Sequence, residues 1–239
     1  MDPHLECRHL VKAFGGFRAV NDMNMAVRKG EIRAIIGPNG AGKSTMFNLL
    51  TGFYPVTSGQ ILYKGVDITR TPAFGRIKMG FSRSFQTPKL FPELSVRQNV
   101  YLAVQARHSR PFEWNVFKFR SLDLPGRTEA LLKVFDFGRH ADHLAGSLSH
   151  GDQRILEISM AMALEPEVLL LDEPTSGMSE KETQKTIDLL MKIHGETPIT
   201  MVIIEHDMRV VQRISHHITV MHLGALLAEG TYEQVEARG

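Results

Sequence analysis

The sequence predicts an α/β fold with a mainly parallel core sheet, an antiparallel β subdomain and an inserted helical lobe. Near-continuous apolar runs at 168–171 and 199–204 alternate with helical patterns. This arrangement is typical of parallel strands that are covered on both faces. Residues 5–11 and 19–27 instead alternate apolar and polar positions, as half-buried antiparallel strands do. From about residue 95 to residue 138 the apolar period is helical, which predicts the inserted lobe.

The other elements follow in chain order from shorter patterns. Short apolar runs bounded by glycine or turn residues predict strands at 31–36, 60–63, 81–85, 217–222 and 225–229. Apolar residues at helical spacing predict helices at 46–52, 96–107, 151–164, 180–194 and 231–237. Ser95 is the expected N-cap of the helix at 96–107. We therefore expect one domain with a core of residues 1–87 and 166–239 and a helical lobe of residues 88–165.

Composition restricts the class of protein. The chain has 239 residues, of which 43% are hydrophobic and 23% charged, as in ordinary soluble globular proteins. A net charge of +2 gives no reason to expect a nucleic-acid partner. Cys7 is the only cysteine, so no internal disulfide forms, which suits a reducing cytoplasm. No apolar run approaches the roughly 20 residues that span a bilayer, and the first residues lack the order of a signal peptide. We expect any role at a membrane to depend on another chain.

A glycine-rich loop stands between a predicted strand and a predicted helix. Residues 37–45, GPNGAGKST, match the pattern G-x-x-x-x-G-K-S/T completely. Because glycine has no Cβ, such a loop turns its backbone N–H groups toward an anion, and the following helix adds its positive end. The residues expected to enclose a nucleotide triphosphate are Gly37, Pro38, Asn39, Gly40, Ala41, Gly42, Lys43, Ser44 and Thr45.

Three side chains of this loop have distinct expected roles. Lys43 is expected to reach the β- and γ-phosphate oxygens, Ser44 to ligate Mg²⁺, and Thr45 to donate near the α-phosphate. The alternative is a glycine-rich turn that matches the pattern by chance, which we put at roughly 1% for a chain of this length. The strand before the loop and an acidic pair further along the chain favour the nucleotide site.

The acidic pair ends a buried strand. In residues 168–174, VLLLDEP, Asp172 follows four apolar residues and so stands at the carboxyl end of the strand, where ligands of open α/β sheets bind. Asp172 is expected to hold Mg²⁺ through water, and Glu173 to orient or deprotonate the attacking water. The alternative is an acidic pair at the surface, as many proteins have. The preceding phosphate loop favours hydrolysis of a nucleotide triphosphate.

A second anion site is predicted where LSHGDQ, residues 148–153, opens the helix at 151–164. Ser149 supplies a hydroxyl and Gly151 an unshielded N–H at a helix start, where phosphates bind. On spacing alone, an ordinary N-cap is the better explanation of Ser149.

The motifs together resemble those of ATP-binding-cassette (ABC) ATPases, in the same order and over nearly the whole chain. GPNGAGKST resembles the Walker A motif, VLLLDEP the Walker B motif and LSHGDQ the LSGGQ signature. FQ at 85–86 resembles the Q-loop, IIEHD at 203–207 the switch-histidine loop, and KAFGG at 12–16 the aromatic A-loop. The resemblance implies the P-loop NTPase fold of an ABC cassette.

The resemblance also implies roles for single residues. Phe14 would stack on adenine, with a core phenylalanine as the alternative. Gln86 would contact the metal and the attacking water, and His206 the γ-phosphate. The signature residues would act on the nucleotide of a second subunit: Ser149, His150, Gly151, Asp152 and Gln153.

The chain departs from the family pattern at three positions. His150 replaces the first glycine of the signature and Asp152 its glutamine, while Ser149 and Gly151 remain. Ser179 stands where the D-loop usually carries an aspartate, which puts in doubt a carboxylate contact across a dimer.

Several longer stretches look like the branched-chain amino-acid branch of the uptake ATPases, among them FGGFRAVNDMNM (14–25), SFQTPKLFPELSVRQNV (84–100) and IEHDMRVV (204–211). This likeness implies two transmembrane permease subunits, a periplasmic or extracellular solute-binding protein, and a peripheral position on the cytoplasmic face of the membrane. The ATPase dimer would be formed with a second copy or with a paralogue. Residues 108–127 would face the permease or lipid, or pack on their own lobe.

Other functions remain open at this point. The solute could be urea or an amide, because LSHG and DEPTSGM also look like urea-transport relatives. A soluble ABC protein would commonly carry tandem cassettes or long coiled coils, and this chain has neither. A GTPase is not supported, because no N-K-x-D motif is present.

Overall fold

A computed structural model of the chain describes residues 2–84, 89–108 and 123–237. The elements form two compact units, which are described separately. The first comprises residues 1–83, 167–174 and 187–239, and the second comprises residues 84–166 and 175–186. The segment 175–186, which the sequence-based division left in the core, groups with the helical unit.

The first unit contains the mainly parallel sheet that the sequence predicts. Within the described residues its strand order is β10-β9-β3-β8-β7-β6, and only β10 runs antiparallel to its neighbour. Both β7 and β8 are buried along their whole length, which explains their continuous apolar sequences. The strands are β3 (Ile32–Ile36), β6 (Phe81–Arg83), β7 (Val168–Asp172), β8 (Thr200–Ile204), β9 (His217–His222) and β10 (Ala225–Gly230).

The same unit also contains an antiparallel sheet with the strand order β2-β1-β4-β5. Its strands are β1 (Leu5–Phe14), β2 (Phe17–Val27), β4 (Ser58–Tyr63) and β5 (Val66–Asp67). The two predicted strands at the N-terminus extend to a tight turn at Gly15 and Gly16, so that Phe14 pairs with Phe17. The antiparallel subdomain is therefore confirmed, with longer strands than the sequence indicated.

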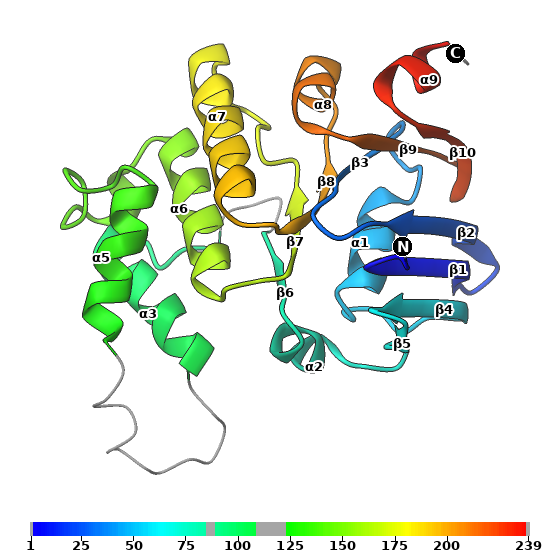
Figure 1. Cartoon of the computed structure of the whole chain (residues 1–239), viewed down its shortest axis with the longest axis horizontal. Coiled ribbons are helices and arrows are strands. Elements are labelled where there is room, and N and C mark those ends of the chain that lie inside the picture. The colour runs from blue at the N-terminus through cyan, green and yellow to red at the C-terminus, as the bar shows by residue number, and fades with distance from the viewer. Residues whose placement is uncertain (1, 85–88, 109–122, 238–239) are drawn as a thin grey trace. The chain divides into compact units, whose positions relative to one another are not determined.

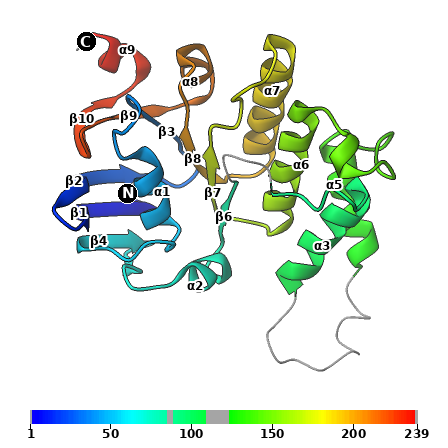
Figure 2. The ribbon, with the colours of Figure 1, turned by 180° about the vertical axis from the view of Figure 1, so that it is seen from behind.

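Helix α1 (Lys43–Leu50) lies between the two sheets, beside β1 and β2 on one side and β3 and β8 on the other (Figures 1 and 2). Its apolar face is fully buried, and Phe47, Leu49 and Leu50 belong to one core cluster with residues of both sheets. This packing holds the helix that follows the glycine-rich loop in a fixed place.

The remaining helices of this unit are short. They are α2 (Ala73–Lys78), α8 (Met208–Ile214) and α9 (Tyr232–Glu236). The sequence pattern does not predict α2 and α8, because one or two helical turns show too little periodicity. Arg76 of α2 is fully buried and donates to the carbonyls of Leu49 and Leu50 at 2.6 and 2.7 Å. These bonds satisfy carbonyl groups at the C-terminal end of α1.

The second unit is helical. Its elements are α3 (Val96–His108), α5 (Leu124–Val134), a 3₁₀ turn (Ala145–Ser147) and α6 (His150–Ala163), and α7 (Glu180–Glu196) begins in this unit. Ser95 caps α3 as predicted: its Oγ accepts from Gln98 N at 3.1 Å, and Gln98 Oε1 accepts from Ser95 N at 2.8 Å. Among the described residues no helix has the length and apolar character to cross a membrane.

Candidate functional site

The glycine-rich loop joins the end of β3 to the start of α1, as its pattern predicts. Gly37 and Gly42 have φ values of 148° and 97°. A Cβ on Gly37 would lie 2.1 Å from Met221 O, and one on Gly42 would lie 2.2 Å from Ala19 O. Glycine is therefore required at both positions, for conformation and for space, because the loop is pressed against the backbone of β2 and β9.

The N-terminus of α1 is suited to an anion. No side chain caps it and its first turn carries no acidic residue, so that its N–H groups are not neutralised by a carboxylate. Lys43, which is 7% exposed, donates from Nζ to Gly37 O at 2.7 Å and to Pro38 O at 3.0 Å. Burial lowers the pKa of Lys43, and the nearby Glu173 and Asp172 oppose this effect. Ser44, on the first turn, is exposed.

The acidic pair stands at the carboxyl edge of the sheet. Asp172, the last residue of β7, is 4% exposed, and its Oδ2 lies 3.1 Å from Nη2 of Arg83. Glu173 leaves the strand with φ 50°, a left-handed conformation that is uncommon for a residue with a side chain. Its N–H still donates to Ile204 O at 2.9 Å, which fixes the backbone of Glu173 to the neighbouring strand β8.

His206 meets Glu173 at this edge. His206 follows β8, and its Nε2 lies 2.8 Å from Oε1 of Glu173. Because a carboxylate only accepts, Nε2 donates this hydrogen bond. The His206 side chain is 42% exposed and the Glu173 side chain 16%. The structure therefore brings together two predicted catalytic residues that are 33 positions apart in the sequence.

The oxygen ligands expected for Mg²⁺ come from α1 and β7. Ser44 supplies a hydroxyl and Asp172 a carboxylate, both of which suit a hard cation. In the described part of the chain, no group of three or more His, Cys, Asp or Glu side chains could hold a metal. A hydroxyl and one carboxylate fit Mg²⁺, which proteins usually bind through one or two carboxylates together with substrate phosphates. Gln86, the third predicted ligand, lies outside the described residues.

Phe14 ends β1 and is not part of the hydrophobic core, since its side chain is 45% exposed. The β1–β2 hairpin brings Phe14 close to the glycine-rich loop. Phe14 pairs with Phe17 across the hairpin, and Ala19, two residues after Phe17, lies against Gly42 of the loop. Such an exposed ring beside a phosphate loop can stack on a base.

In the helical unit, the residues LSHGDQ form the start of α6. Ser149 Oγ accepts from Asp152 N at 3.1 Å, so that the N-cap interpretation holds for this hydroxyl. The same Oγ lies 3.0 Å from Oδ2 of Asp152 and 3.4 Å from Oε1 of Glu182. A Cβ on Gly151 would come within 2.6 Å of that Glu182 oxygen. Two carboxylates therefore surround the predicted second anion site.

Gln153 and Ser179 form local hydrogen bonds near the starts of α6 and α7. Gln153 Nε2 donates to Leu148 O at 3.2 Å. Ser179, in the D-loop position, donates from N and Oγ to Glu182 Oε2 at 2.9 and 2.7 Å, and these bonds lower the pKa of Glu182. Ser179 thus stabilises the start of α7.

The structure adds residues that the sequence analysis missed. Arg83 donates to Asn48 Oδ1 at 2.5 Å as well as contacting Asp172, so that it joins β6, α1 and β7 at the site. Asn48 lies one helical turn after Ser44, which could have indicated that it faces the same side of α1. No local pattern marks Arg83 or Glu182, whose contacts join distant parts of the chain.

Comparison with known proteins identifies relatives over nearly the whole chain. A family model described as ABC transporter matches residues 20–176. The chain is 40% identical over 238 residues to the high-affinity branched-chain amino acid transport ATP-binding protein BraF of Pseudomonas aeruginosa, covering 98% of this chain and 93% of that protein. It is 38% identical, with the same coverage, to LivG of Escherichia coli, which carries the same description.

Solved structures show the same fold. A nucleotide-free ATP-binding cassette from an ABC transporter is 29% identical with a TM-score of 0.84, covering 99% of this chain and 94% of that chain. The ADP conformation of an ABC-transporter cassette gives the same values. A dimeric cassette bound to ADP and Pi is 25% identical with a TM-score of 0.80, covering 95% of this chain and 98% of that chain. With the family model and the relatives of nearly full length, these structures establish that the chain belongs to the ABC transporter family.

Proposed function

We propose that the chain is the ATP-hydrolysing subunit of an ABC importer for branched-chain amino acids. The contact between Glu173 and His206 beside Asp172 supports the hydrolytic role, because the side chains proposed as general base and as γ-phosphate ligand meet at one sheet edge. The names of the relatives in Pseudomonas aeruginosa and Escherichia coli support the choice of solute.

The residues of the loop and of the sheet edge have different roles in hydrolysis. Lys43 and the N–H groups of α1 hold the β- and γ-phosphates, and Glu173 takes the proton of the attacking water. The hydrogen bond from His206 holds the Glu173 carboxylate in place. In this proposal the His206 imidazole also contacts the γ-phosphate. Mg²⁺, held by Ser44 and Asp172 with Gln86, would neutralise the charge of the phosphate oxygens.

The proposed transport mechanism uses two anion sites that belong to different units of the chain. The phosphate loop lies in one unit and Ser149 with Gly151 in the other. In this proposal each ATP is held between the loop of one subunit and the signature of a second subunit, which is another copy or a paralogue. ATP then stabilises the closed pair, because it binds that state with extra contacts, and hydrolysis removes them. Two transmembrane permease subunits, on whose cytoplasmic face the chain is bound, convert closure and opening into uptake.

The choice of solute is tested with the assembled transporter. The chain is co-purified with its permease subunits and its solute-binding protein and reconstituted in liposomes. We expect accumulation of radiolabelled leucine that depends on ATP and is lost with Glu173→Gln. Uptake of urea but not of leucine would leave the proposed ATPase role intact and overturn the assignment of branched-chain amino acids as the solute.

A further inference from the structure

The Phe14 ring is contacted by Tyr54, which lies outside the motifs quoted above, and by Lys12, the first residue of the A-loop stretch. Tyr54 packs its ring edge-on against Phe14, with the ring centroids 5.5 Å apart and an angle of 82° between the planes. Lys12 Nζ lies 4.9 Å from the centroid of the Phe14 ring and 5.8 Å from that of Tyr54. Both distances are within the range of a cation–π contact.

Lys12 is unusual for a lysine because its side chain is almost wholly inaccessible. The residue is 8% exposed, and it forms no ion pair with a carboxylate in the described ranges. Its ammonium donates to Pro55 O at 2.8 Å. A buried charge without a carboxylate is costly unless other groups compensate it. Here one carbonyl and two aromatic rings do so, which ties the position of Lys12 to that of Phe14.

The segment that carries Tyr54 is itself fixed at both ends. The N–H groups of Phe53 and Tyr54 donate to Asn48 O of α1 at 2.8 and 3.0 Å. At the other end, Thr57 N donates to Val11 O, and Ala13 N donates to Thr57 Oγ1, each at 3.0 Å. The segment 53–57 therefore connects the C-terminal end of the phosphate-loop helix to the strand end that carries Phe14.

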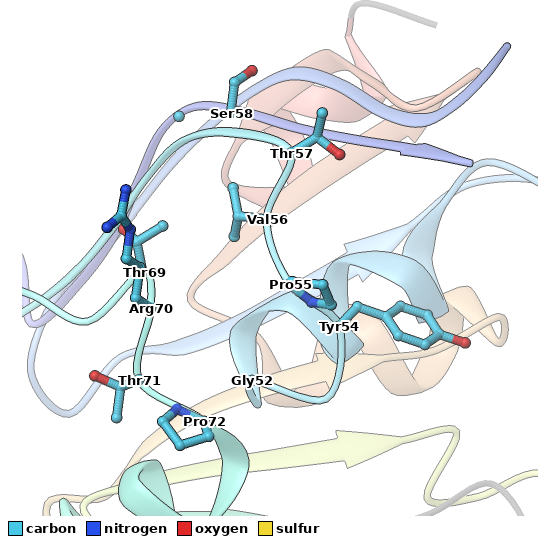
Figure 3. Close-up of a pocket in the computed structure, with 11 residues that line it drawn as sticks. Gly52, Tyr54, Pro55, Val56, Thr57, Ser58, Thr69, Arg70, Thr71 and Pro72 are labelled. Carbon is cyan, nitrogen blue, oxygen red and sulfur yellow. The ribbon is translucent and has the colours of Figure 1, made fainter. Parts of the chain in front are cut away.

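Figure 3 shows the neighbourhood of this segment. Gly52 and residues 54–59 and 69–72 line a hollow of about 550 Å³, and the Tyr54 ring points away from Arg70 and Thr71 on its far wall. The ring is thus available to Phe14, with which it makes the edge contact given above. Tyr54 is 37% exposed and is not part of the hydrophobic core.

We propose that Lys12 and Tyr54 are positioning residues that hold Phe14 in place as the platform for the adenine base. The inference rests on the proposed nucleotide-binding function. A ring that is ordered before binding loses less side-chain freedom when the base stacks on it, and this raises affinity. The effect concerns the base alone, because the phosphate loop contacts the other end of the nucleotide.

The test compares a ligand that has a base with one that lacks it. Affinities of the whole chain for ATP and for inorganic tripolyphosphate are measured by calorimetry in the wild type and in Lys12→Met, Tyr54→Leu and Phe14→Ala. Phe14→Ala is expected to weaken ATP binding by roughly tenfold or more. Lys12→Met and Tyr54→Leu are each expected to weaken it about three- to tenfold. None of the three is expected to change the affinity for tripolyphosphate.

Two further variants sharpen the comparison. Lys12→Arg keeps a cation over the rings and is expected to restore most of the ATP affinity. Lys78→Met removes a contact of the same kind, in which Nζ lies 4.5 Å from the Phe74 ring centroid on the exposed face of α2. This variant is expected to change neither affinity. In the Phe14→Ala background, Lys12→Met should have no additional effect, because its target is absent.

The outcomes separate this inference from the proposed function. Unchanged ATP affinity in Phe14→Ala would overturn the base-stacking role on which the inference rests. A loss in Phe14→Ala without a loss in Lys12→Met and Tyr54→Leu would overturn the inference alone. Equal losses for ATP and tripolyphosphate in Lys12→Met would also overturn it, since Lys12 would then act through the phosphate loop. If Lys12→Met does not fold, the ATP and tripolyphosphate affinities of Tyr54→Leu decide whether the inference holds.

Discussion

Glu173→Gln is expected to lower the rate of ATP hydrolysis by about a hundredfold or more while the chain still binds ATP. The amide keeps the shape of the side chain and its contact with His206, but it does not accept the proton of the attacking water. The phosphate loop is untouched, so binding remains. The measurement is steady-state release of phosphate, together with ATP affinity determined by calorimetry.

The matched control for this variant is Glu167→Gln. Glu167 directly precedes β7, so that it lies at the opposite end of the same strand, where it pairs with Lys64 at 2.6 Å on the surface. Exposed pairs contribute little to stability, and this variant should hydrolyse ATP at the wild-type rate. If Glu173→Gln also turned over normally, Glu173 would have no part in the chemistry.

Lys43→Ala is expected to abolish turnover and to weaken ATP binding by about a hundredfold. Lys43 is 7% exposed, and its ammonium donates to Gly37 O and Pro38 O of the loop, so that it approaches the phosphates without much further ordering. Its removal leaves the phosphate charge without its main cationic partner in the loop. Affinity for ATP, with tripolyphosphate as a second ligand, measures the loss.

Lys29→Ala provides the comparison, because Lys29 is exposed just before the opposite end of β3. It changes the net charge by the same amount and is expected to leave both affinities unaltered. Tight ATP binding by Lys43→Ala would remove Lys43 from its assigned position at the phosphates.

The parts of the site that sequence predicts well are contiguous. Gly37 and Gly42 stand in a loop whose geometry follows from its own residues, and Asp172 ends a strand whose apolar run predicts its burial. The parallel sheet was predictable for the same reason. Short elements such as α2 and α8 were not, because their residues form helices through tertiary contacts such as the carbonyl bonds of Arg76.

Contacts between distant residues could not be predicted. Arg83 and Asp172 are 89 positions apart, and no local period relates them. The same is true of Phe14 and Tyr54, which meet only because the segment after α1 returns to the end of β1. The contact between His206 and Glu173 was indicated only indirectly, by the rule that parallel strands end at one sheet edge.

The central claim is that a phosphate loop and a signature from two separate chains act on one ATP. Its most direct test mixes Lys43→Ala with Ser149→Arg, each of which should be inactive alone. A mixed pair contains one intact site, built from the loop of the Ser149→Arg chain and the signature of the Lys43→Ala chain. We expect hydrolysis to return on mixing, at concentrations where the wild type is active. A mixture that remains as inactive as its two components would contradict the account.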